Sequence, residues 1–432
     1  MRDKFDVLVV GAGVAGIQAS IELADAGLKV GLIEKQTFAG GKAVQLYRVF
    51  PTDDCAFCVT STRLKMGIRK CFYRSALSEH PNITLYTKTS IQAIRGEAGN
   101  FEVEAIEEPR FVSSDRCTLC KACIEACPTA QTDQGLDSNQ RKAIYIPHPQ
   151  CIPQSVTIDR DLCEEGCEEC ARACFFNAID LEAEEKLHTL RAKSVIVSTG
   201  FEEFGSAGIE TYGYGSYPNV VTQLQLARML DPTGPTRGRV VRVSDRKDAS
   251  RIVMVQCVGS RDEKVVPYCS SLCCAFALKH AKMIKEEKSP GTSIHIIYMD
   301  MRTPCQLEDY FSSSRKLGID FMRGRIAHVD EMEDRSLEIS AYDTLIGKQM
   351  HLRADLLVLA SPLIPSNNRL PEIKYDKHGY ISQALDLSKT SKEGVYACGM
   401  AVEPMEISRA TVTARSAAFQ VIKLLREVKG VG

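Results

Sequence analysis

The sequence lacks most of the features that would assign it at once to a class of proteins. Its net charge is −1, so the composition gives no reason to expect a nucleic-acid partner. No run approaches about 18 uncharged apolar residues, so no membrane span of its own is expected. The mixed charges of residues 1–6 are not typical of a signal peptide. A Ser-His-Asp order, a Walker motif and an H-E-x-x-H motif are also missing, so none of these catalytic signatures applies.

Cysteine, in contrast, is abundant, with 18 residues in a chain of 432. Disulfide frameworks belong to small secreted domains, and the lack of an export signal predicts a reducing, cytoplasmic location. The apolar fraction of 44% and the charged fraction of 25% are ordinary for a globular protein. A chain of this length is expected to form two or three domains.

Eight cysteines are concentrated between Cys117 and Cys174, in two runs that repeat at an offset of 46 or 47 residues. The first run is the bacterial ferredoxin pattern C-x2-C-x2-C-x3-C-P, in which the fourth cysteine ligates the cluster of the other run. Short gaps aim three thiolates at one cubane, so we predict two [4Fe-4S] clusters. The predicted ligands are Cys117, Cys120, Cys123 and Cys174 for one cluster, and Cys127, Cys163, Cys167 and Cys170 for the other.

The second run departs from the pattern in two ways. Its first gap holds three residues, and Phe175 stands where the first run has Pro128. A pair of structural zinc sites is the alternative, although such sites rarely combine three close cysteines with a distant fourth. Cys151, in the proline-rich stretch between the runs, is not expected to be a ligand.

The N-terminal stretch carries a dinucleotide-binding fingerprint. An apolar run at 5–10 predicts a buried parallel strand, and a Gly-x-Gly-x-x-Gly turn, a helix and a second strand at 29–33 follow it. The glycines allow a pyrophosphate to approach the N-terminus of the helix, and the acid after the second strand can accept from a ribose hydroxyl. The predicted contacts are Gly11, Gly13, Gly16, Glu34 and the neighbouring Lys35.

Further turns favour FAD over NAD. Gly40-Gly41-Lys42 has the spacing seen in flavoproteins with two dinucleotide-binding units, which adds Gly41 and Lys42 to the predicted contacts; an ordinary tight turn is the alternative. Gly200, after the apolar strand at 194–199, and Gly399, after a short strand, are expected to return the chain to FAD. Met400 stands where such flavoproteins usually carry Asp. A helix at 408–425, of apolar period near 3.6, would close the FAD domain.

Cys55 and Cys58 form a C-x2-C pair close in sequence to the expected flavin site. Three interpretations are open for this pair. It can ligate a metal together with donors elsewhere, act as a redox dithiol, or consist of buried thiols without a chemical role.

A strand at 251–256 opens a second nucleotide-fold-like unit whose turn carries cysteines in place of the glycine fingerprint. A second dinucleotide site is therefore not expected. Cys269 and Cys273, at the start of a helix, are expected to share one side of a turn, while adjacent cysteines on a helix point about 100° apart. We predict a third [4Fe-4S] cluster, with a set of buried thiols as the alternative. The predicted ligands are Cys257, Cys269, Cys273 and Cys274.

Together these motifs resemble the A subunits of heterodisulfide reductase and their relatives, over nearly the whole chain. The resemblance implies an α/β, thioredoxin-reductase-like two-dinucleotide-binding flavoprotein fold with an inserted bacterial-ferredoxin-like (α+β) two-cluster domain. It is carried by the Gly11 fingerprint, FPTDDCAFC at 50–58, the insert at 117–174, YGYGSYPNV at 212–220, and QCVGSRDEK with YCSSLCCAFALKHA within 256–281.

The resemblance also implies roles for residues after the second strand. It implies that Cys257, Cys269, Cys273 and Cys274 bind an atypical cluster next to FAD. It further implies that Lys279 approaches the flavin N5 as the catalytic residue, whereas from the residues alone Lys279 is equally an ordinary solvated helix residue.

The implied function is that of an FAD-containing oxidoreductase subunit with three [4Fe-4S] clusters, which passes electrons to partner subunits in sulfur, thiol-disulfide or anaerobic energy metabolism. The expected partners are heterodisulfide-reductase B- and C-like subunits or equivalent redox subunits, with a homodimer inside a larger cytoplasmic complex. The extra N-terminal domain and the C-terminal ferredoxin domain of the full-length methanogen type are not found, which leaves flavin-based bifurcation open. The alternatives are an NAD(P)H-oxidising flavin and iron–sulfur subunit, the flavin subunit of a quinone-interacting membrane-bound oxidoreductase, and a non-catalytic cluster scaffold.

The expected domain organisation alternates between two units and an insert. The basic run at 237–251 is expected to be a solvated face, with docking of an acidic partner as the alternative. The FAD-binding domain is expected at 1–110, 183–245 and 366–432, the ferredoxin-like insert at 111–182, and the second nucleotide-fold-like domain at 246–365.

Overall fold

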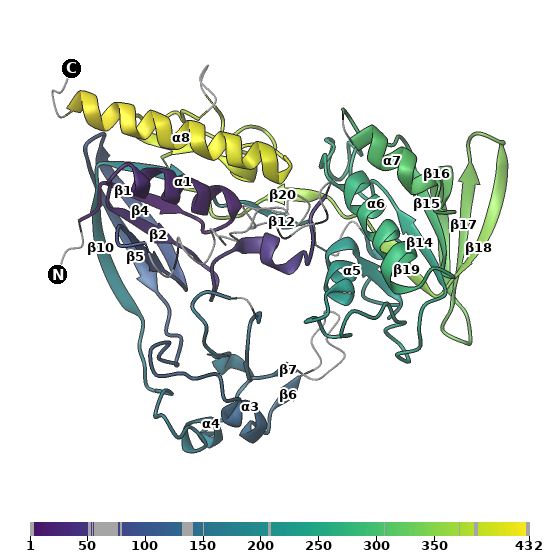
Figure 1. Cartoon of the computed structure of the whole chain (residues 1–432), viewed down its shortest axis with the longest axis horizontal. Coiled ribbons are helices and arrows are strands. Elements are labelled where there is room, and N and C mark those ends of the chain that lie inside the picture. Colours follow the sequence, from purple (N-terminus) through teal and green to yellow (C-terminus); the bar gives the residue numbers. More distant parts are fainter. Residues whose placement is uncertain are drawn as a thin grey trace, which may run out of the picture.

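The fold is known from a computed structural model of the chain, which consists of two sheet-based units and a smaller module (Figure 1). The described residues are 4–50, 53, 55, 77, 80–131, 141–149, 151–205, 209–305, 307–370, 372–383 and 388–428.

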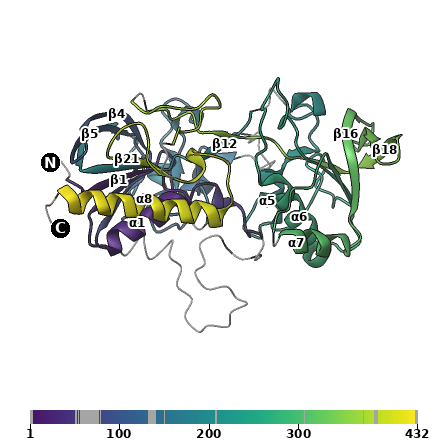
Figure 2. The ribbon, with the colours of Figure 1, turned by 90° about the horizontal axis from the view of Figure 1, so that it is seen from above.

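The first unit is built on a five-stranded parallel sheet. Four of its strands are buried and rich in Val, Ile and Leu, as expected for a sheet covered on both faces, while the fifth, at one edge, is partly exposed. Helices α1 (Val14–Asp25) and α8 (Ile407–Val428) cover one face (Figure 2). The strands in spatial order are β21 (Val395–Ala397), β11 (Ser194–Val197), β1 (Val7–Val10), β2 (Val30–Ile33) and β3 (Ile83–Tyr86).

The other face of this sheet is covered by an antiparallel three-stranded sheet. Its strands are β10 (Lys186–Ala192), β5 (Asn100–Glu107) and β4 (Thr89–Glu97), in that order. Phe101, Val103 and Leu190 pack from it against the buried side chains of β1 and β11.

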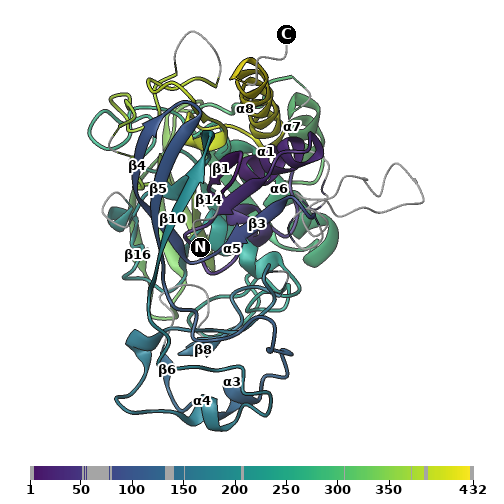
Figure 3. The same cartoon turned by 90° about the vertical axis from the view of Figure 1, so that its left-hand side faces the viewer.

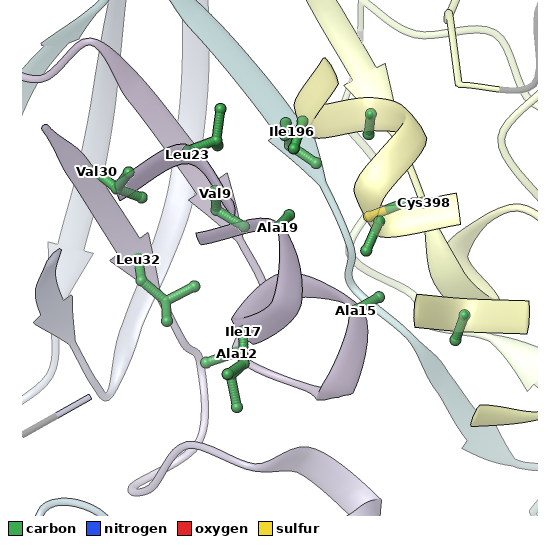
Figure 4. Close-up of a cluster of buried hydrophobic side chains, with 14 of the residues drawn as sticks. Val9, Ala12, Ala15, Ile17, Ala19, Leu23, Val30, Leu32, Ile196 and Cys398 are labelled. Carbon is green, nitrogen blue, oxygen red and sulfur yellow. The ribbon is translucent and has the colours of Figure 1, made fainter. Parts of the chain in front are cut away.

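The core under the two helices joins chain segments that are distant in sequence. Small residues of α8, among them Ala414 and Ala417, recur at helical spacing and allow α8 to pack closely on α1. Figure 4 shows Ile17 and Leu23 of α1, Ile196 of β11 and Cys398 after β21 within one cluster of buried side chains. This packing holds the turn that follows β1 against the turn that follows β21.

The inserted module lies between β5 and β10 in the sequence and projects away from both units (Figure 3). It is held by two short ladders, two helices and a small core of cysteine and aliphatic side chains. Its elements are α3 (Ala122–Ala126), β6 (Ala130–Gln131), β7 (Arg141–Lys142), β8 (Ile144–Tyr145), β9 (Thr157–Ile158), the 3-10 turn η3 (Arg160–Leu162) and α4 (Glu169–Arg172).

The second unit is built on a seven-stranded mixed sheet. Its first five strands in spatial order are parallel, and the last two continue as an antiparallel meander. The strands are β13 (Val220–Thr222), β19 (Leu356–Leu359), β14 (Arg251–Val255), β15 (Ser293–Tyr298), β16 (Asp320–Glu331), β17 (Leu337–Asp343) and β18 (Lys348–Ala354).

Helices pack on this sheet, and a short ladder accompanies the two chain crossings between the units. The helices are α5 (Gln223–Leu230), α6 (Cys273–Met283) with its π-helical end η6 (Ile284–Lys288), and α7 (Leu307–Arg315). The ladder is formed by β12 (Phe201–Glu203) and β20 (Leu363–Pro365), while η1 (Gly41–Gln45), η5 (Glu210–Tyr212) and η7 (Gly399–Ala401) are single turns.

One expected boundary is corrected by the strand pairing. We expected residues 183–245 to continue the first unit, but β13 pairs with β19 and α5 packs on α6, both in the second unit. The short apolar strand and its amphipathic helix pack their buried side chains into the core of the second unit, so this unit begins before Val220.

Candidate functional site

A cavity of about 540 Å³ lies where the first and second units meet. Seven of the nine residues predicted to bind the dinucleotide line it: Gly11, Gly13, Glu34, Lys35, Gly41, Lys42 and Gly200. Helix α6 of the second unit contributes Cys273 and Phe276 to the same wall. The cavity therefore borders both the glycine fingerprint and the cysteine-rich stretch of the second unit.

The turn after β1 leaves its backbone open toward this cavity. Gly11 has φ +100°, and a Cβ there would overlap the carbonyl oxygen of Ser198. A Cβ on Gly13, in contrast, would meet nothing within 4 Å. Gly13 precedes the first residue of α1, so there is room for a phosphate at the N-terminus of this helix, which fits a dinucleotide.

The two remaining predicted glycines, Gly16 and Gly399, serve close packing. A Cβ on Gly16 would overlap the carbonyl oxygen of Gly11, and a Cβ on Gly399 would lie 2.7 Å from the Cβ of Ala15. Both glycines therefore bring the surrounding backbone together, and their part in any cofactor site is indirect.

Glu34 is buried at the end of β2, with 8% of its surface exposed. One carboxylate oxygen accepts from the Ala12 N–H and the other from the Gln36 N–H, each at 2.8 Å. Burial raises the pKa of Glu34, against the effect of these backbone donors. The carboxylate thus fixes the glycine turn from behind while it lines the cavity.

Four cysteines of the inserted module surround a second, small cavity: Cys117, Cys120, Cys123 and Cys174. Burial raises the pKa of Cys123 to about 11, and the nearby sulfurs of Cys117, Cys174 and Cys120 add to the rise. The structure thus brings together the set assigned from spacing to one cluster. Cysteines from the two runs come together because α3 and α4 pack on each other.

The other four cysteines of the module form a second group. Burial raises the pKa of Cys170, and the sulfurs of Cys163, Cys127 and Cys167 act on it in the same direction. Thiols this close repel each other when they all ionise, and iron compensates such repulsion, so both groups fit cubane ligation.

Zinc is the alternative metal for these cysteines, and it draws its ligands to about 2.0–2.3 Å around one point. Within the described ranges, no three Cys, His, Asp or Glu side chains converge on a single-ion site. The preference for iron over zinc therefore rests on the spacing of the two cysteine runs.

Three of the four predicted cluster ligands of the second unit lie together. Cys273 and Cys274, at the start of α6, pack with Ala360 and Met301. A hydrogen bond from Cys273 lowers the pKa of Cys257 to about 6, and Arg261 and Arg302 favour the thiolate further. The amide of Arg302 also donates to the Cys274 sulfur at 3.5 Å.

We expected Cys269 and Cys273 to share one helical turn, and this prediction is wrong. Ser271 has φ +62°, which interrupts a right-handed helix, and α6 begins only at Cys273. Cys269 therefore lies in the preceding loop, where its sulfur accepts from the Ser271 N–H at 3.3 Å.

The sequence patterns did not predict Arg261 and Arg302 as residues of the site at Cys257, Cys273 and Cys274. The Arg261 guanidinium donates to the Asp300 carboxylate at 2.7 Å, and Asp300 and Arg302 follow β15. The pairing of β14 with β15 places this segment beside Cys257 and Cys274. Arg261 stands within the Cys257 motif, but nothing in the sequence pointed to Arg302.

Lys279 is not a solvated helix residue, since only 1% of it is exposed. Its Nζ donates to the Arg48 carbonyl at 2.7 Å and lies 5.1 Å from the ring centroid of Phe276. Burial lowers the pKa of Lys279 to about 7. Among the described residues, Phe276 lines the cavity and Lys279 does not, so the Lys279 ammonium lies one side chain behind the cavity wall.

The remaining expected features have plain positions. Cys55 is exposed, which contradicts the buried-thiol interpretation for it, while Cys58 lies outside the described residues. Cys151 is buried, with its thiol 3.4 Å from the Pro153 carbonyl.

The basic run at 237–251 pairs largely with neighbouring acids, including Arg251 with Asp355 at 2.6 Å, which favours a structural surface over a docking patch. No helix in the described part of the chain has the length and apolarity to cross a membrane.

Comparison with known proteins identifies the class. Residues 6–107 match the family of FAD dependent oxidoreductases, and residues 111–130 match the 4Fe-4S binding domain. The fold is similar to that of T. acidophilum thioredoxin reductase, with a TM-score of 0.52 and 16% identity over 98% of this chain and 99% of that one. The chain thus has a thioredoxin-reductase-like flavoprotein fold with a ferredoxin-like 4Fe-4S insert, and the predicted fold class is confirmed.

Sequence comparison is more specific. The chain is 38% identical over 429 residues to the iron-sulfur A subunit of CoB–CoM heterodisulfide reductase from Methanocaldococcus jannaschii, covering 96% of this chain and 63% of that protein. It is 36% identical over 425 residues to the A subunit of H(2):CoB-CoM heterodisulfide,ferredoxin reductase from Methanothermobacter thermautotrophicus, covering 95% and 62%. The chain is a homologue of the A subunits of heterodisulfide reductases, which confirms the resemblance seen in its motifs. It spans under two thirds of the length of these relatives.

Proposed function

We propose that this chain is the FAD- and iron–sulfur-containing electron-transfer subunit of a heterodisulfide-reductase-like complex of the cytoplasm. The observation that carries the proposal is the shared wall of the cavity, where Gly13 of the fingerprint and Cys273 of the second unit line one space. When bound, FAD exchanges electrons in pairs or singly, whereas a [4Fe-4S] cluster exchanges them singly.

The first unit supplies the binding surface for the flavin cofactor. The open backbone at Gly13 and the N-terminus of α1 suit a pyrophosphate, and Glu34 and Lys35 line the cavity near the end of β2. The apolar wall, including Phe276 and Met405, excludes water from the remainder of the cavity.

The cysteines supply thiolates for three [4Fe-4S] clusters in this proposal. The two groups in the inserted module and the group at Cys257, Cys273 and Cys274, with Cys269 from the neighbouring loop, provide four ligands each. Arg261 and Arg302 place positive charge beside the last group and offset its negative charge.

Lys279 is proposed as the residue that holds positive charge behind the cavity wall. Its burial keeps the ammonium poorly solvated, so its field reaches the cavity with little screening. We propose that Lys279 acts on the flavin N5 through this charge.

The partners are proposed from the names of the relatives, which are subunits of heterodisulfide reductases. B- and C-like subunits or equivalent redox subunits would receive the electrons, with a homodimer inside the complex. Whether the flavin bifurcates electrons, and whether the acceptor is a disulfide or a quinone, follows from those partners.

The test is an anaerobic analysis of the purified chain. We expect one non-covalent FAD, iron bound in the module, and no saturable binding of NADH or NADPH in the micromolar range. Gln256 and Cys257, at the end of β14, stand where an NAD(P)H site would need glycines. Reduction of the flavin by stoichiometric NADH would favour the NAD(P)H-oxidising alternative, and loss of FAD with retained clusters would favour a scaffold.

A further inference from the structure

Two adjacent aromatic side chains stand in solvent at the tip of the inserted module. Phe175 is 90% exposed and Phe176 is 45% exposed. Their rings meet edge to face, with centroids 5.5 Å apart. Phe175 occupies the place that Pro128 holds in the first run, so the departure from the ferredoxin pattern creates an apolar surface. Aromatic groups left in water contribute nothing to the core, and such patches commonly mark interaction sites.

This aromatic pair adjoins the first group of cysteines. Phe175 follows Cys174, and Phe176 lines the cavity that Cys117, Cys120, Cys123 and Cys174 surround. The module projects from the rest of the molecule, and α4, which leads into Phe175, lies at its far end (Figure 1). A protein bound here would contact the shell of this cysteine group and neither of the two larger units.

The charge around the aromatic pair has one dominant sign. Residues 161–185 hold nine acidic side chains against a single basic one, Arg172, in a chain whose net charge is −1. Residues 115–139, the corresponding stretch of the first half of the module, hold four acids and two bases. The acids of α4 and of the loop before it, including Glu164, Glu165 and Glu168, are exposed. The half that carries the exposed aromatics is therefore also the acidic half.

We propose that Phe175, Phe176 and the surrounding acids, here called the Phe175 face, dock a one-electron carrier protein whose contact surface is apolar at its centre and ringed by Lys or Arg. Opposite charges steer and orient the encounter, and the aromatic pair supplies the desolvated centre. Transient redox encounters use small interfaces of this kind. The inference rests on the proposed function, because it takes the adjacent cysteines to hold a cluster.

The experiment measures binding without turnover. Oxidised protein, reconstituted with FAD and iron, is titrated into ¹⁵N-labelled cytochrome c, a basic haem protein used as the probe, at low and at moderate salt. Phe175→Ala is compared with Phe419→Ala, whose ring is 65% exposed on α8. Glu164→Gln with Glu165→Gln is compared with Glu333→Gln and Glu338→Gln, exposed acids of the second unit.

We expect Phe175→Ala to weaken binding roughly five- to tenfold, as for a central aromatic contact, and Phe419→Ala to leave it unchanged. The acid pair at 164–165 should flatten the salt dependence, while the control pair should not. Equal binding by Phe175→Ala and the native chain would overturn the inference. So would a change from dimer to monomer in sedimentation of Phe175→Ala, because the face would then be covered by a second copy. Iron and FAD contents, measured on the same samples, report separately on the proposed function.

Discussion

The two main sheets have a similar order of strands around one central strand, but different residues follow that strand in each sheet. In the first sheet β1 lies between β11 and β2, and in the second β14 lies between β19 and β15. After β1 the chain turns through glycines directly into α1, whereas after β14 it places Cys257 at φ +57° and reaches α6 only at Cys273. One strand end exposes backbone N–H groups, and the other is filled with thiols and guanidinium groups. Similar topology therefore carries two different strand ends, one with room for a phosphate and one whose thiols we propose to hold iron.

The largest expected effect on this difference between the two strand ends is at Gly13. Gly13→Val should abolish FAD binding, because its side chain would occupy the space left for the phosphate, while the described neighbours leave the fold unstrained. We expect at least about a hundredfold weaker binding with a nearly unchanged melting temperature. The FAD content and circular dichroism measure this. Gly291→Val, at a glycine of the second unit that is equally open, is the control, and an equal loss of FAD there would contradict the assignment.

At the other strand end the matching change is Cys273→Ala. Three cubanes predict about twelve irons per chain, and loss of one of four thiolates should reduce this to about eight while FAD stays bound. Anaerobic iron analysis measures the difference. Cys398→Ala removes a buried thiol of the first unit and should keep about twelve irons. A native chain with about eight irons would show that the second unit holds buried thiols without a cluster.

The two helices differ at their seventh residue as well, where α1 has Ser20 and α6 has Lys279. Burial lowers the pKa of Lys279 from 10.5 to about 7, so between these pH values the unfolded chain binds more protons than the folded one. The free energy of unfolding should then rise with pH in this window, by at most about 1.4 kcal/mol per pH unit.

Lys279→Met should remove this rise, which denaturation midpoints at several pH values would detect. Lys282→Met, on the same helix, is the matched control. A rise that persists in Lys279→Met would assign it to other groups.

The smallest expected effect concerns the flavin potential. Lys279→Ala should keep FAD and iron, and the flavin midpoint should fall by tens of millivolts, since about 1.4 kcal/mol corresponds to about 30 mV for two electrons. The ammonium stabilises anionic reduced flavin only while it is charged, so the difference should shrink as the pH rises above about 7. An unchanged midpoint in a spectroelectrochemical titration at about pH 6, where the ammonium is charged, would exclude Lys279 from tuning the flavin.

Sequence patterns predicted what depends on local spacing. The Gly11 fingerprint predicted β1, α1 and β2, and the two runs of cysteines predicted which four sulfurs would lie together. These succeeded because turns and ligand gaps are short-range constraints. The start of α6 was missed because the left-handed conformation of Ser271 has no mark in the sequence.

Long-range packing explains the remaining differences. The placement of β13 in the second sheet depends on its pairing with β19, more than 130 residues later. Arg302 comes near Cys274 only through the pairing of β14 with β15, and the burial of Lys279 requires the Arg48 carbonyl from the first unit. A lysine on a helix gives no sign of such a partner.

The first sheet is assembled from distant parts of the chain, and this has a consequence for biosynthesis. Its β1 and α1 come from the N-terminal stretch, but β21 and α8, which complete the sheet and cover it, are translated last. The second unit, by comparison, is contiguous from β13 to β19 and can fold while the ribosome is still working. The nascent first unit must therefore keep an apolar sheet face uncovered until α8 emerges, and this interval is when chaperones and aggregation would compete for the chain.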